Sequence, residues 1–346
     1  MSSPALSGES DNVRKVAILG TGSWGTALAF HLAHAGHDVS LWGRNAELVS
    51  EMTLRRTNAV YLPDIVLPAA VAPTASLEEA LDSAEIVVAA VPSHGTRAVI
   101  RSASPYIPRQ ALIVSATKGL EQDTLLRISE VIAQEVRGAR PIAVLSGPSF
   151  AMEVARGLPT AVCVACADPV LAEDVQREFR APYFRLYAST DIAGVEIGGA
   201  LKNTIAIAAG VVEGMGLGQN ALAALITRGL AEITRLACAA GGHRETLAGL
   251  SGLGDLVLTC TGSLSRNRHV GIELGHGRQI SEVVAGMKMV AEGVRTTSVA
   301  LALGRRHGVE LPIATQMAEV LAGTRSAAAA VEELMLRPQK TEQESH

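Results

Sequence analysis

Two observations in the sequence predict an α/β fold, with a doubly wound, mostly parallel sheet followed by an all-α C-terminal domain. In the first half of the chain, short apolar runs alternate with helical patterns, as in a parallel sheet wrapped by helices. After residue 190 helical patterns continue and no convincing strand follows. We therefore expect a sheet domain over residues 13–189 and a helical domain over residues 190–337. The polar segments 1–12 and 338–346 are expected to be flexible tails.

The first strand ends in a glycine motif. The apolar run 15–19 is followed by Gly20-Thr21-Gly22-Ser23-Trp24-Gly25, a Gly-x-Gly-x-x-Gly pattern, and then by an apolar helix pattern. In a βαβ unit Gly20 allows the tight turn, Gly22 lets the backbone approach a pyrophosphate, and Gly25 lets the helix pack close to the strand. The helix N-terminus adds unpaired N–H groups. The context on both sides of the motif predicts a Rossmann-type dinucleotide-binding domain over residues 13–189.

The end of the second strand indicates which cofactor is preferred. Gly36 is expected to end the first helix, and residues 37–43 form the next strand pattern. A site for NAD usually has Asp or Glu about 20 residues after the glycines, to accept from the ribose 2′-OH. This chain has Arg44 there, which can pair with a 2′-phosphate but cannot accept a hydrogen bond. The sequence therefore favours NADPH, and the alternative is a solvated surface arginine.

The remaining elements of the sheet domain follow from apolar runs and turn residues. Helices are expected at 45–57, from Ser76, at 95–102, 123–137 and 168–180, and strands at 85–92, 111–118, 142–148, 160–166 and 184–187. Pro63 and Pro68 mark a loop. Cys163 and Cys166 have the C-x-x-C spacing, but no second pair of ligands accompanies them, and in a strand they point to opposite faces. They are interpreted as buried structural thiols.

Composition excludes several classes of protein. The 346 residues carry a net charge of −4, without a basic stretch suited to nucleic acid. No uninterrupted apolar run reaches the ~18 residues of a membrane span. The first residues have neither the basic region nor the apolar core of a signal peptide. We therefore expect a cytoplasmic protein with reduced thiols, and the apolar helices of the second half favour a homodimer.

Three segments follow apolar strands, at the edge where such sheets bind ligands. They are residues 92–94, 117–120 and 146–150. Ordinary turn chemistry accounts for Gly-Pro and Pro-Ser in them. Lys118 is different, because a cation at the end of a buried strand suits an anionic or carbonyl-bearing ligand.

The helical domain begins with a long apolar helix that Asp191 is expected to cap. Its several glycines cost about 1 kcal/mol each against alanine, so the close approach of a ligand or of a second helix should explain them. Lys202 is a lone cation among small and apolar residues, one turn after Gly198. Burial would lower its pKa toward neutrality and suit it to proton transfer. The alternative is a lysine that reaches the surface.

Two further segments of this domain carry polar groups. Residues 250–256 place Asp255 after what reads as a glycine-rich turn. Residues 265–268 open a helix with Ser265 as its cap, and arginine together with helix N–H groups suits a phosphate. Taken alone, either segment could be a solvated turn or helix start.

Six segments, in this order along the chain, carry a resemblance to one family. They are Gly-Thr-Gly-Ser-Trp-Gly-Thr-Ala at 20–27, Ala-Thr-Lys-Gly-Leu-Glu at 116–121, Ser-Gly-Pro-Ser-Phe-Ala at 146–151, Gly-Ala-Leu-Lys-Asn at 199–203, Gly-Leu-Gly-Asp-Leu at 252–256 and Ser-Arg-Asn at 265–267. The set resembles the bacterial NAD(P)-dependent glycerol-3-phosphate dehydrogenases, over residues 13–333. That resemblance implies reversible hydride transfer between NAD(P)H and dihydroxyacetone phosphate, giving sn-glycerol 3-phosphate for membrane lipid synthesis.

The resemblance also implies roles for individual residues. Lys202 would exchange the proton, Lys118 would touch substrate and cofactor, and Asp255 would orient the substrate or Lys202. Substrate contacts are implied for Lys118, Gly147, Ser149, Lys202, Asn203, Asp255, Thr259, Ser265, Arg266 and Asn267. Dinucleotide contacts are implied for Gly20, Gly22, Ser23, Trp24, Gly25, Arg44, Lys118, Ala151, Arg266, Val290 and Glu292. Ser149 stands where relatives often have threonine, which keeps the hydroxyl. No metal site is expected.

Two other functions are weighed against this one. The first is a related Rossmann dehydrogenase acting on a hydroxyacid or a phosphorylated sugar acid. The second is a non-catalytic NADP-binding sensor, which would need the dinucleotide site but not Lys202, Asp255 or Arg266. The presence of all three residues favours the dehydrogenase.

Overall fold

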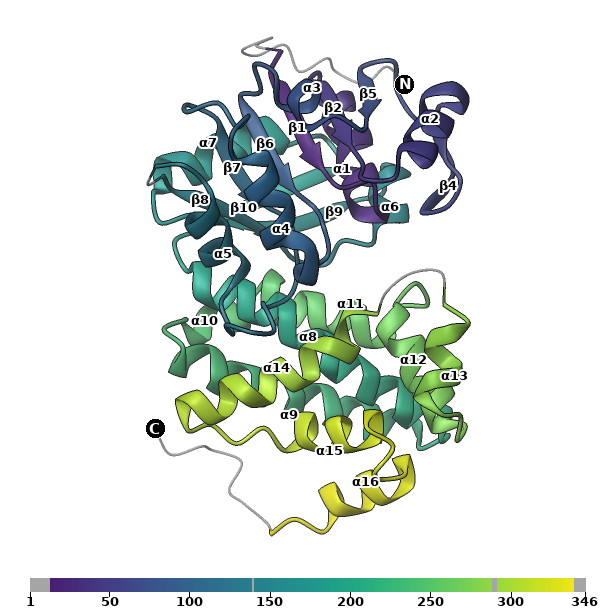
Figure 1. Cartoon of the computed structure of the whole chain (residues 1–346). Coiled ribbons are helices and arrows are strands. Elements are labelled where there is room, and N and C mark those ends of the chain that lie inside the picture. Colours follow the sequence, from purple (N-terminus) through teal and green to yellow (C-terminus); the bar gives the residue numbers. More distant parts are fainter. Residues whose placement is uncertain (1–12, 139, 288–290, 339–346) are drawn as a thin grey trace, which may run out of the picture.

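The structure, a computed structural model, describes residues 13–138, 140–287 and 291–338. Figure 1 shows two stacked parts, a sheet domain formed by the first half of the chain and a helical domain formed by the second. The last strand ends at Ser189 and the first helix of the second part begins at Ile192. Among the described residues after Ser189 there is no strand, as the sequence predicts.

The sheet has eight strands in the order β10-β9-β8-β7-β6-β1-β2-β5. All neighbours are parallel except β8 and β9, so the predicted doubly wound, mostly parallel sheet is confirmed. Its strands are β1 (Lys15–Leu19), β2 (Asp38–Trp42), β5 (Val71–Thr74), β6 (Ile86–Ala89), β7 (Leu112–Ser115), β8 (Ile142–Ser146), β9 (Thr160–Ala165) and β10 (Phe184–Ser189). The chain leaves β1 toward β2 on one side and reaches β6 on the other, so the switch point lies between β1 and β6.

Helices cover both faces of this sheet (Figure 1). They are α1 (Ser23–His34), α2 (Ala46–Arg55), α3 (Leu77–Leu81), α4 (Ser93–Ala103), α5 (Ile128–Glu135), α6 (Ala151–Ala155) and α7 (Pro169–Phe179). Side chains alternate along each strand, so Val16 and Ile18 pack toward α1 and α7, whereas Ala17 and Leu19 pack toward α3, α4 and α5. This two-sided burial explains why the strands read as continuous apolar runs.

Three details of the sheet domain differ from the sequence predictions. The expected loop around Pro63 contains a small hairpin, β3 (Thr57–Asn58) with β4 (Leu62–Val66), and β5 then joins the edge of the sheet. Helix α5 begins at Ile128 rather than at residue 123. The preceding residues form a tight turn instead, in which Leu120 pairs with Arg127.

The prediction that Cys163 and Cys166 are buried is confirmed. Cys163 and Cys166 are both buried, and neither forms a disulfide. Cys163 packs with Val195 of the helical domain, whereas Cys166 belongs to the core on the other face of the sheet.

The helical domain is arranged around α8 (Ile192–Gly214), against which most of its other helices pack (Figure 1). The elements that follow α8 are α9 (Gly218–Ala239), α10 (Arg244–Leu247), the π-helical turn η1 (Leu250–Gly254), α11 (Asp255–Thr261), α12 (Arg266–Gly275), α13 (Ile280–Ala285), α14 (Glu292–His307), α15 (Pro312–Leu321) and α16 (Ala327–Met335). By length and composition α8 could cross a membrane, but its whole apolar window is buried inside the protein. Asp191 caps it, as predicted, by accepting from the Gly194 N–H at 2.8 Å.

Close helix packing explains two of the glycines in α8. A Cβ on Gly210 would lie 2.0 Å from the carbonyl oxygen of Arg268, and a Cβ on Gly271 would lie 1.9 Å from that of Ile207. Gly214 and Gly275 repeat this contact one turn further along. The two helices therefore approach backbone to backbone, which fixes α12 beside the C-terminal half of α8.

Candidate active site

Two lysines from different domains meet at one buried carboxylate. Lys118 follows β7, Lys202 lies in the middle of α8, and Asp255 is the first residue of α11. Lys118 Nζ donates to Asp255 Oδ2 at 2.7 Å, and Lys202 Nζ donates to Asp255 Oδ1. Asp255 is 1% exposed. The site therefore lies where the carboxyl ends of the strands face α8 and α11, as expected for an open α/β sheet.

The surroundings of Lys202 favour its neutral form. The residue is 6% exposed, and its Nζ also donates to Thr259 Oγ1 at 2.9 Å. Burial lowers the pKa of Lys202 most, Asp255 opposes this shift, and the charge of Lys118 adds to it, so that the pKa is about 7. The prediction of a buried lysine with a lowered pKa is confirmed. The alternative, a lysine reaching the surface, is wrong.

The backbone before Asp255 is helical, where the sequence analysis expected a glycine-rich turn. Residues 250–254 form a π-helical turn that continues directly into α11. A Cβ on Gly252 would lie 2.1 Å from the carbonyl oxygen of Leu247, so glycine is needed for this compact turn. The extra residue of a π turn shifts the helix face that follows, which directs Asp255 into the crevice.

Lys118 is held by the turn after β8 as well as by Asp255. Its Nζ donates to the carbonyl oxygen of Gly147 at 2.8 Å and lies 3.4 Å from Ser149 Oγ. Gly147 has a φ of +136°, and a Cβ there would lie 3.0 Å from the Cα of Val162. Gly147 and Ser149 thus lie beside Lys118, and both are near the place where a ligand would meet Lys202.

A buried chain of amides joins three helices of the helical domain. Asn267 Nδ2 donates to Asn203 Oδ1 at 2.9 Å, and Asn267 Oδ1 accepts from the Gly293 N–H at 2.9 Å. Ser265 caps α12 by accepting from the Arg268 N–H at 3.2 Å. Because the Asn203 oxygen accepts from Asn267, the Asn203 NH₂ group keeps its capacity to donate. The Asn267 side chain therefore holds Asn203 and the start of α14 in place.

The glycine motif has the geometry that a pyrophosphate needs. Gly20 has a φ of +127°, and a Cβ on Gly25 would lie 1.9 Å from the carbonyl oxygen of Gly20. The space over Gly22 is open, because a Cβ there would meet nothing within 4 Å. The Trp24 indole N–H is buried without a partner in the part of the chain that the structure describes. Open backbone at a helix N-terminus and an unused donor fit a bound dinucleotide.

The other predicted cofactor residues lie along the same crevice. Arg44 is exposed after β2, three strands along the sheet from β7. Ala151 is the first residue of α6, and Glu292 is the first residue of α14. Arg266 is exposed at the start of α12, near enough to Glu292 for their charges to attract. Ser23 Oγ donates to the carbonyl oxygen of Tyr61 at 2.6 Å. Val290 lies outside the described residues.

One contact at the crevice was missed by the sequence analysis. Ser93, at the start of α4, donates to Glu292 Oε2 at 2.9 Å. The segment 92–94 was singled out only as a strand end. Its partner is 199 residues away in the chain, so no local pattern could have indicated the contact.

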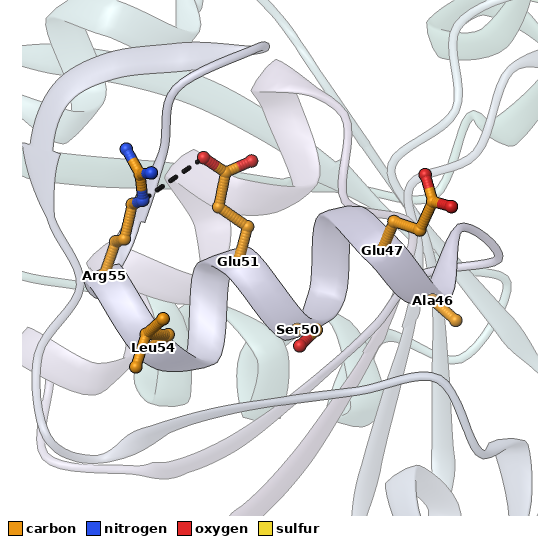
Figure 2. Close-up of a pocket in the computed structure, with 6 residues that line it drawn as sticks. All are labelled: Ala46, Glu47, Ser50, Glu51, Leu54 and Arg55. Atoms are coloured by element: carbon orange, nitrogen blue, oxygen red, sulfur yellow. Dashed lines mark ion pairs between the residues drawn. The ribbon is translucent and has the colours of Figure 1, made fainter.

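Two hollows on the surface of the described residues lie away from this crevice. Figure 2 shows one on the outer side of α2, lined by Ala46, Glu47, Ser50, Glu51, Leu54 and Arg55, in which Glu51 and Arg55 form an ion pair of 3.4 Å. A second hollow lies between β9, β10 and the α10–η1 segment. Neither is lined by a predicted site residue. Within the described ranges no group of three or more His, Cys, Asp or Glu residues could hold a metal ion.

Fold and site together have the organisation of a two-domain, dinucleotide-dependent oxidoreductase. The family models for the N-terminus and the C-terminus of NAD-dependent glycerol-3-phosphate dehydrogenase match residues 15–172 and 191–332. The chain belongs to this family, so the resemblance inferred from the sequence motifs is confirmed.

Similar proteins agree with this assignment. A glycerol-3-phosphate dehydrogenase [NAD(P)+] from Koribacter versatilis is 53% identical over 273 residues, which cover 78% of this chain and 81% of that protein. One from Moorella thermoacetica is 52% identical over 269 residues, covering 78% and 80%. The crystal structure of glycerol-3-phosphate dehydrogenase from Coxiella burnetii superposes with a TM-score of 0.90 at 41% identity, covering 94% of this chain and 99% of that one.

Proposed function

We propose that this chain transfers a hydride reversibly between NAD(P)H and dihydroxyacetone phosphate, forming sn-glycerol 3-phosphate. The observation that carries this proposal is the buried cluster of Lys202, Asp255 and Lys118 at the crevice of a chain that belongs to the glycerol-3-phosphate dehydrogenase family. A hydroxyacid dehydrogenase or a non-catalytic sensor is not favoured by any observation here.

The sheet domain would hold the cofactor. Its pyrophosphate would lie over Gly22 at the N-terminus of α1, where the Trp24 indole N–H offers a further donor. Gly20 and Gly25 shape this turn, and Ser23, Ala151, Arg266, Val290 and Glu292 would contact the dinucleotide. When bound, NAD(P)H supplies the hydride that reduces the ketone.

Lys202 would exchange the proton at the substrate oxygen. Reduction of the ketone leaves an alkoxide at C2, to which the protonated Nζ of Lys202 would donate. Its pKa of about 7 places both protonation states within reach at neutral pH. Asp255 and Thr259 hold Nζ in place, and Lys118 would stabilise the developing negative charge on the oxygen.

The start of α12 would bind the phosphate end of the substrate. Arg266 offers a guanidinium, and the first N–H groups of α12, capped by Ser265, offer further donors. The Asn203 NH₂ group would add a donor between Lys202 and the phosphate, while Asn267 holds Asn203 and leaves its backbone N–H to the substrate. Gly147 and Ser149 would line the opposite wall. Phosphate binding remote from C2 would orient the reacting carbon.

Arg44 would make NADPH the preferred cofactor over NADH. It lies at the end of β2, where a carboxylate would select NAD, and its side chain is exposed toward solvent. The family uses either cofactor, as the name of the Koribacter versatilis protein states. The preference rests on the charge of Arg44 alone.

Further proposals concern the setting of the enzyme. We propose domain boundaries at 13–189 and 190–337, which the ranges of the two family models support. We also propose a homodimer in the cytoplasm that supplies sn-glycerol 3-phosphate to glycerophospholipid synthesis, the role expected from the family resemblance.

One assay tests the central proposal. Purified protein is mixed with dihydroxyacetone phosphate and either NADPH or NADH, and the absorbance of the reduced cofactor is followed. We expect consumption with both cofactors and faster turnover at low NADPH concentration. A hydroxyacid dehydrogenase would instead respond to a 2-oxo acid, and a sensor would bind NADPH without consuming it.

A further inference from the structure

A partly buried hydrogen bond joins the two domains at the crevice. Ser93 is the first residue of α4 and is 6% exposed. Its hydroxyl donates to Oε2 of Glu292, at the start of α14, over 2.9 Å. Ser93 belongs to the turn that follows β6 in the sheet domain, whereas Glu292 belongs to the helical domain. The bond therefore fixes the start of α14 against the carboxyl end of β6.

The loop after β7 packs onto this bond. A Cβ on Gly119 would lie 2.7 Å from the Cβ of Ser93 and 3.8 Å from Oε2 of Glu292. Gly119 has a φ of +147°, which side-chain-bearing residues rarely adopt. Because Gly119 follows Lys118 directly, the Ser93–Glu292 pair lies beside the loop that carries one of the two site lysines.

The position of this pair relates it to one half of the cofactor. A dinucleotide spans the switch point of such a sheet, here between β1 and β6. Arg44, after β2, lies on the side of the adenosine half. Ser93 and Gly119, after β6 and β7, lie on the side of the nicotinamide half. A carboxylate only accepts hydrogen bonds, so the groups of a bound cofactor that could donate to Glu292 on this side are the ribose hydroxyls and the carboxamide NH₂ group.

Glu292 is also linked to the substrate side of the site. The next residue, Gly293, donates through its N–H to Asn267, which in turn holds Asn203 one residue after Lys202. A Cβ on Gly293 would lie 2.6 Å from the carbonyl oxygen of Asn203, so the start of α14 has no room to shift. Ser93 thus holds the Glu292 carboxylate from the sheet domain, the amide chain holds the backbone beside it, and the charge of Arg266 also attracts the carboxylate.

We propose that Ser93 is a positioning residue that fixes the Glu292 carboxylate as the acceptor for the nicotinamide half of NAD(P)H. This inference rests on the proposed function. Without the Ser93 hydroxyl, the carboxylate loses a charge-assisted hydrogen bond and is free to rotate away from the cofactor. Binding of the nicotinamide half is weakened, whereas binding of the adenosine half, which lies across the switch point, is not.

The experiment compares two ligands in the absence of substrate. Dissociation constants are measured for NADPH, by its fluorescence, and for adenosine 2′,5′-bisphosphate, which lacks the nicotinamide half, by calorimetry. The variants are Ser93→Ala, Glu292→Ala and the double variant. The control is Ser102→Ala, an exposed serine of the same helix.

We expect Ser93→Ala to weaken the binding of NADPH about tenfold, as for the loss of one charge-assisted hydrogen bond, and to leave the binding of the bisphosphate unchanged. Glu292→Ala should show the same selectivity, and the double variant should bind NADPH no more weakly than Glu292→Ala, because Ser93 acts through Glu292. In turnover, the KM for NADPH should rise more than kcat falls. Ser102→Ala should resemble the wild type.

Three results would overturn the inference while leaving the proposed function intact. The first is an unchanged NADPH affinity in Ser93→Ala. The second is an equal loss of affinity for NADPH and for the bisphosphate in that variant. The third is a double variant in which the affinity losses of the two single variants add. A wild-type protein that binds no NADPH would overturn the proposed function as well.

Discussion

In the sheet domain the site is made mainly of backbone, whereas in the helical domain it is made of buried polar side chains. Around the glycine motif the groups that face a cofactor are the open backbone over Gly22 and the first N–H groups of α1. In the helical domain Lys202, Asp255 and Thr259 are buried, at most 6% exposed, and hydrogen-bonded to one another. Lys118 is the main side chain that the sheet domain adds to this cluster.

The difference reflects how each kind of element presents polar groups. Strand ends and helix N-termini leave backbone groups unpaired, so a sheet edge binds phosphates without buried charges. Helix interiors have no free backbone groups, so a helical domain must contribute side chains, and their burial changes their pKa values. Cofactor binding should therefore depend mostly on the sheet domain, and proton transfer and binding of the substrate phosphate on the helical domain.

The largest expected effect tests proton transfer. We expect Lys202→Ala to lower kcat by about 10²–10⁴-fold, because general acid–base catalysis is lost, and to leave NADPH binding intact. Steady-state kinetics and a fluorescence titration with NADPH measure the two properties on the same preparation. Near-wild-type turnover in the folded variant would remove Lys202 from the mechanism.

Phosphate binding by the helical domain is tested at Arg266. We expect Arg266→Ala to raise the KM for dihydroxyacetone phosphate roughly ten- to hundredfold and to weaken discrimination against unphosphorylated dihydroxyacetone. Arg268→Ala is the matched control, since that arginine lies on the same helix and pairs with Glu213 at 2.6 Å. If only cofactor affinity changed, Arg266 would belong to the dinucleotide site instead.

Cofactor choice is tested at the sheet edge. We expect the wild type to favour NADPH over NADH by about ten- to hundredfold in KM, and Arg44→Asp to reverse the preference, because a carboxylate repels the 2′-phosphate and accepts from a free 2′-OH. Arg55→Asp makes the same charge change on α2 (Figure 2) and should leave the ratio unchanged. If the KM values for NADPH and NADH were equal and Arg44→Asp did not change them, Arg44 would only face solvent.

The pH dependence should follow Lys202. Ketone reduction needs its protonated form, so kcat/KM for reduction should fall by up to about tenfold per pH unit above its pKa of about 7. Alcohol oxidation needs the neutral amine and should rise as the pH increases through the same value. Initial rates in both directions between pH 5.5 and 9 (a range of about one and a half to two units on each side of the pKa) measure these profiles. Parallel profiles in the two directions would contradict this role.

The smallest effects concern packing. We expect Gly210→Ala to lower the free energy of unfolding by about 1–3 kcal/mol, since its Cβ would meet the backbone of α12 at 2.0 Å. Gly95→Ala in α4 is the counterpart in the sheet domain, where a Cβ meets nothing within 4 Å, and it should raise stability by about 0.4–1 kcal/mol. Denaturant unfolding of both variants gives the comparison. If both variants lost the same free energy of unfolding, the α8–α12 contact would not be tightly packed.

The sequence by itself determined the sheet domain and the order of its site segments. Apolar runs, the glycine motif and the caps at Ser76 and Asp191 are local signals, because strand burial, turns and helix starts depend on neighbours in the chain. The position of Lys118 at a strand end followed from the same pattern. The sequence around Lys202 also indicated burial, because its helix consists of small and apolar residues and has no polar face that would lie in solvent.

Only the tertiary structure decided which side chains meet. Asp255 reaches Lys202 from 53 residues away and Lys118 from 137, and Ser93 reaches Glu292 from 199, distances over which no periodicity carries information. The π turn before Asp255 and the hairpin β3–β4 were likewise not indicated by the local sequence pattern, which predicts a glycine-rich turn and a loop at these places. The pKa of Lys202 also depends on the tertiary structure, because folding buries the side chain and brings the charges of Asp255 and Lys118 close to it.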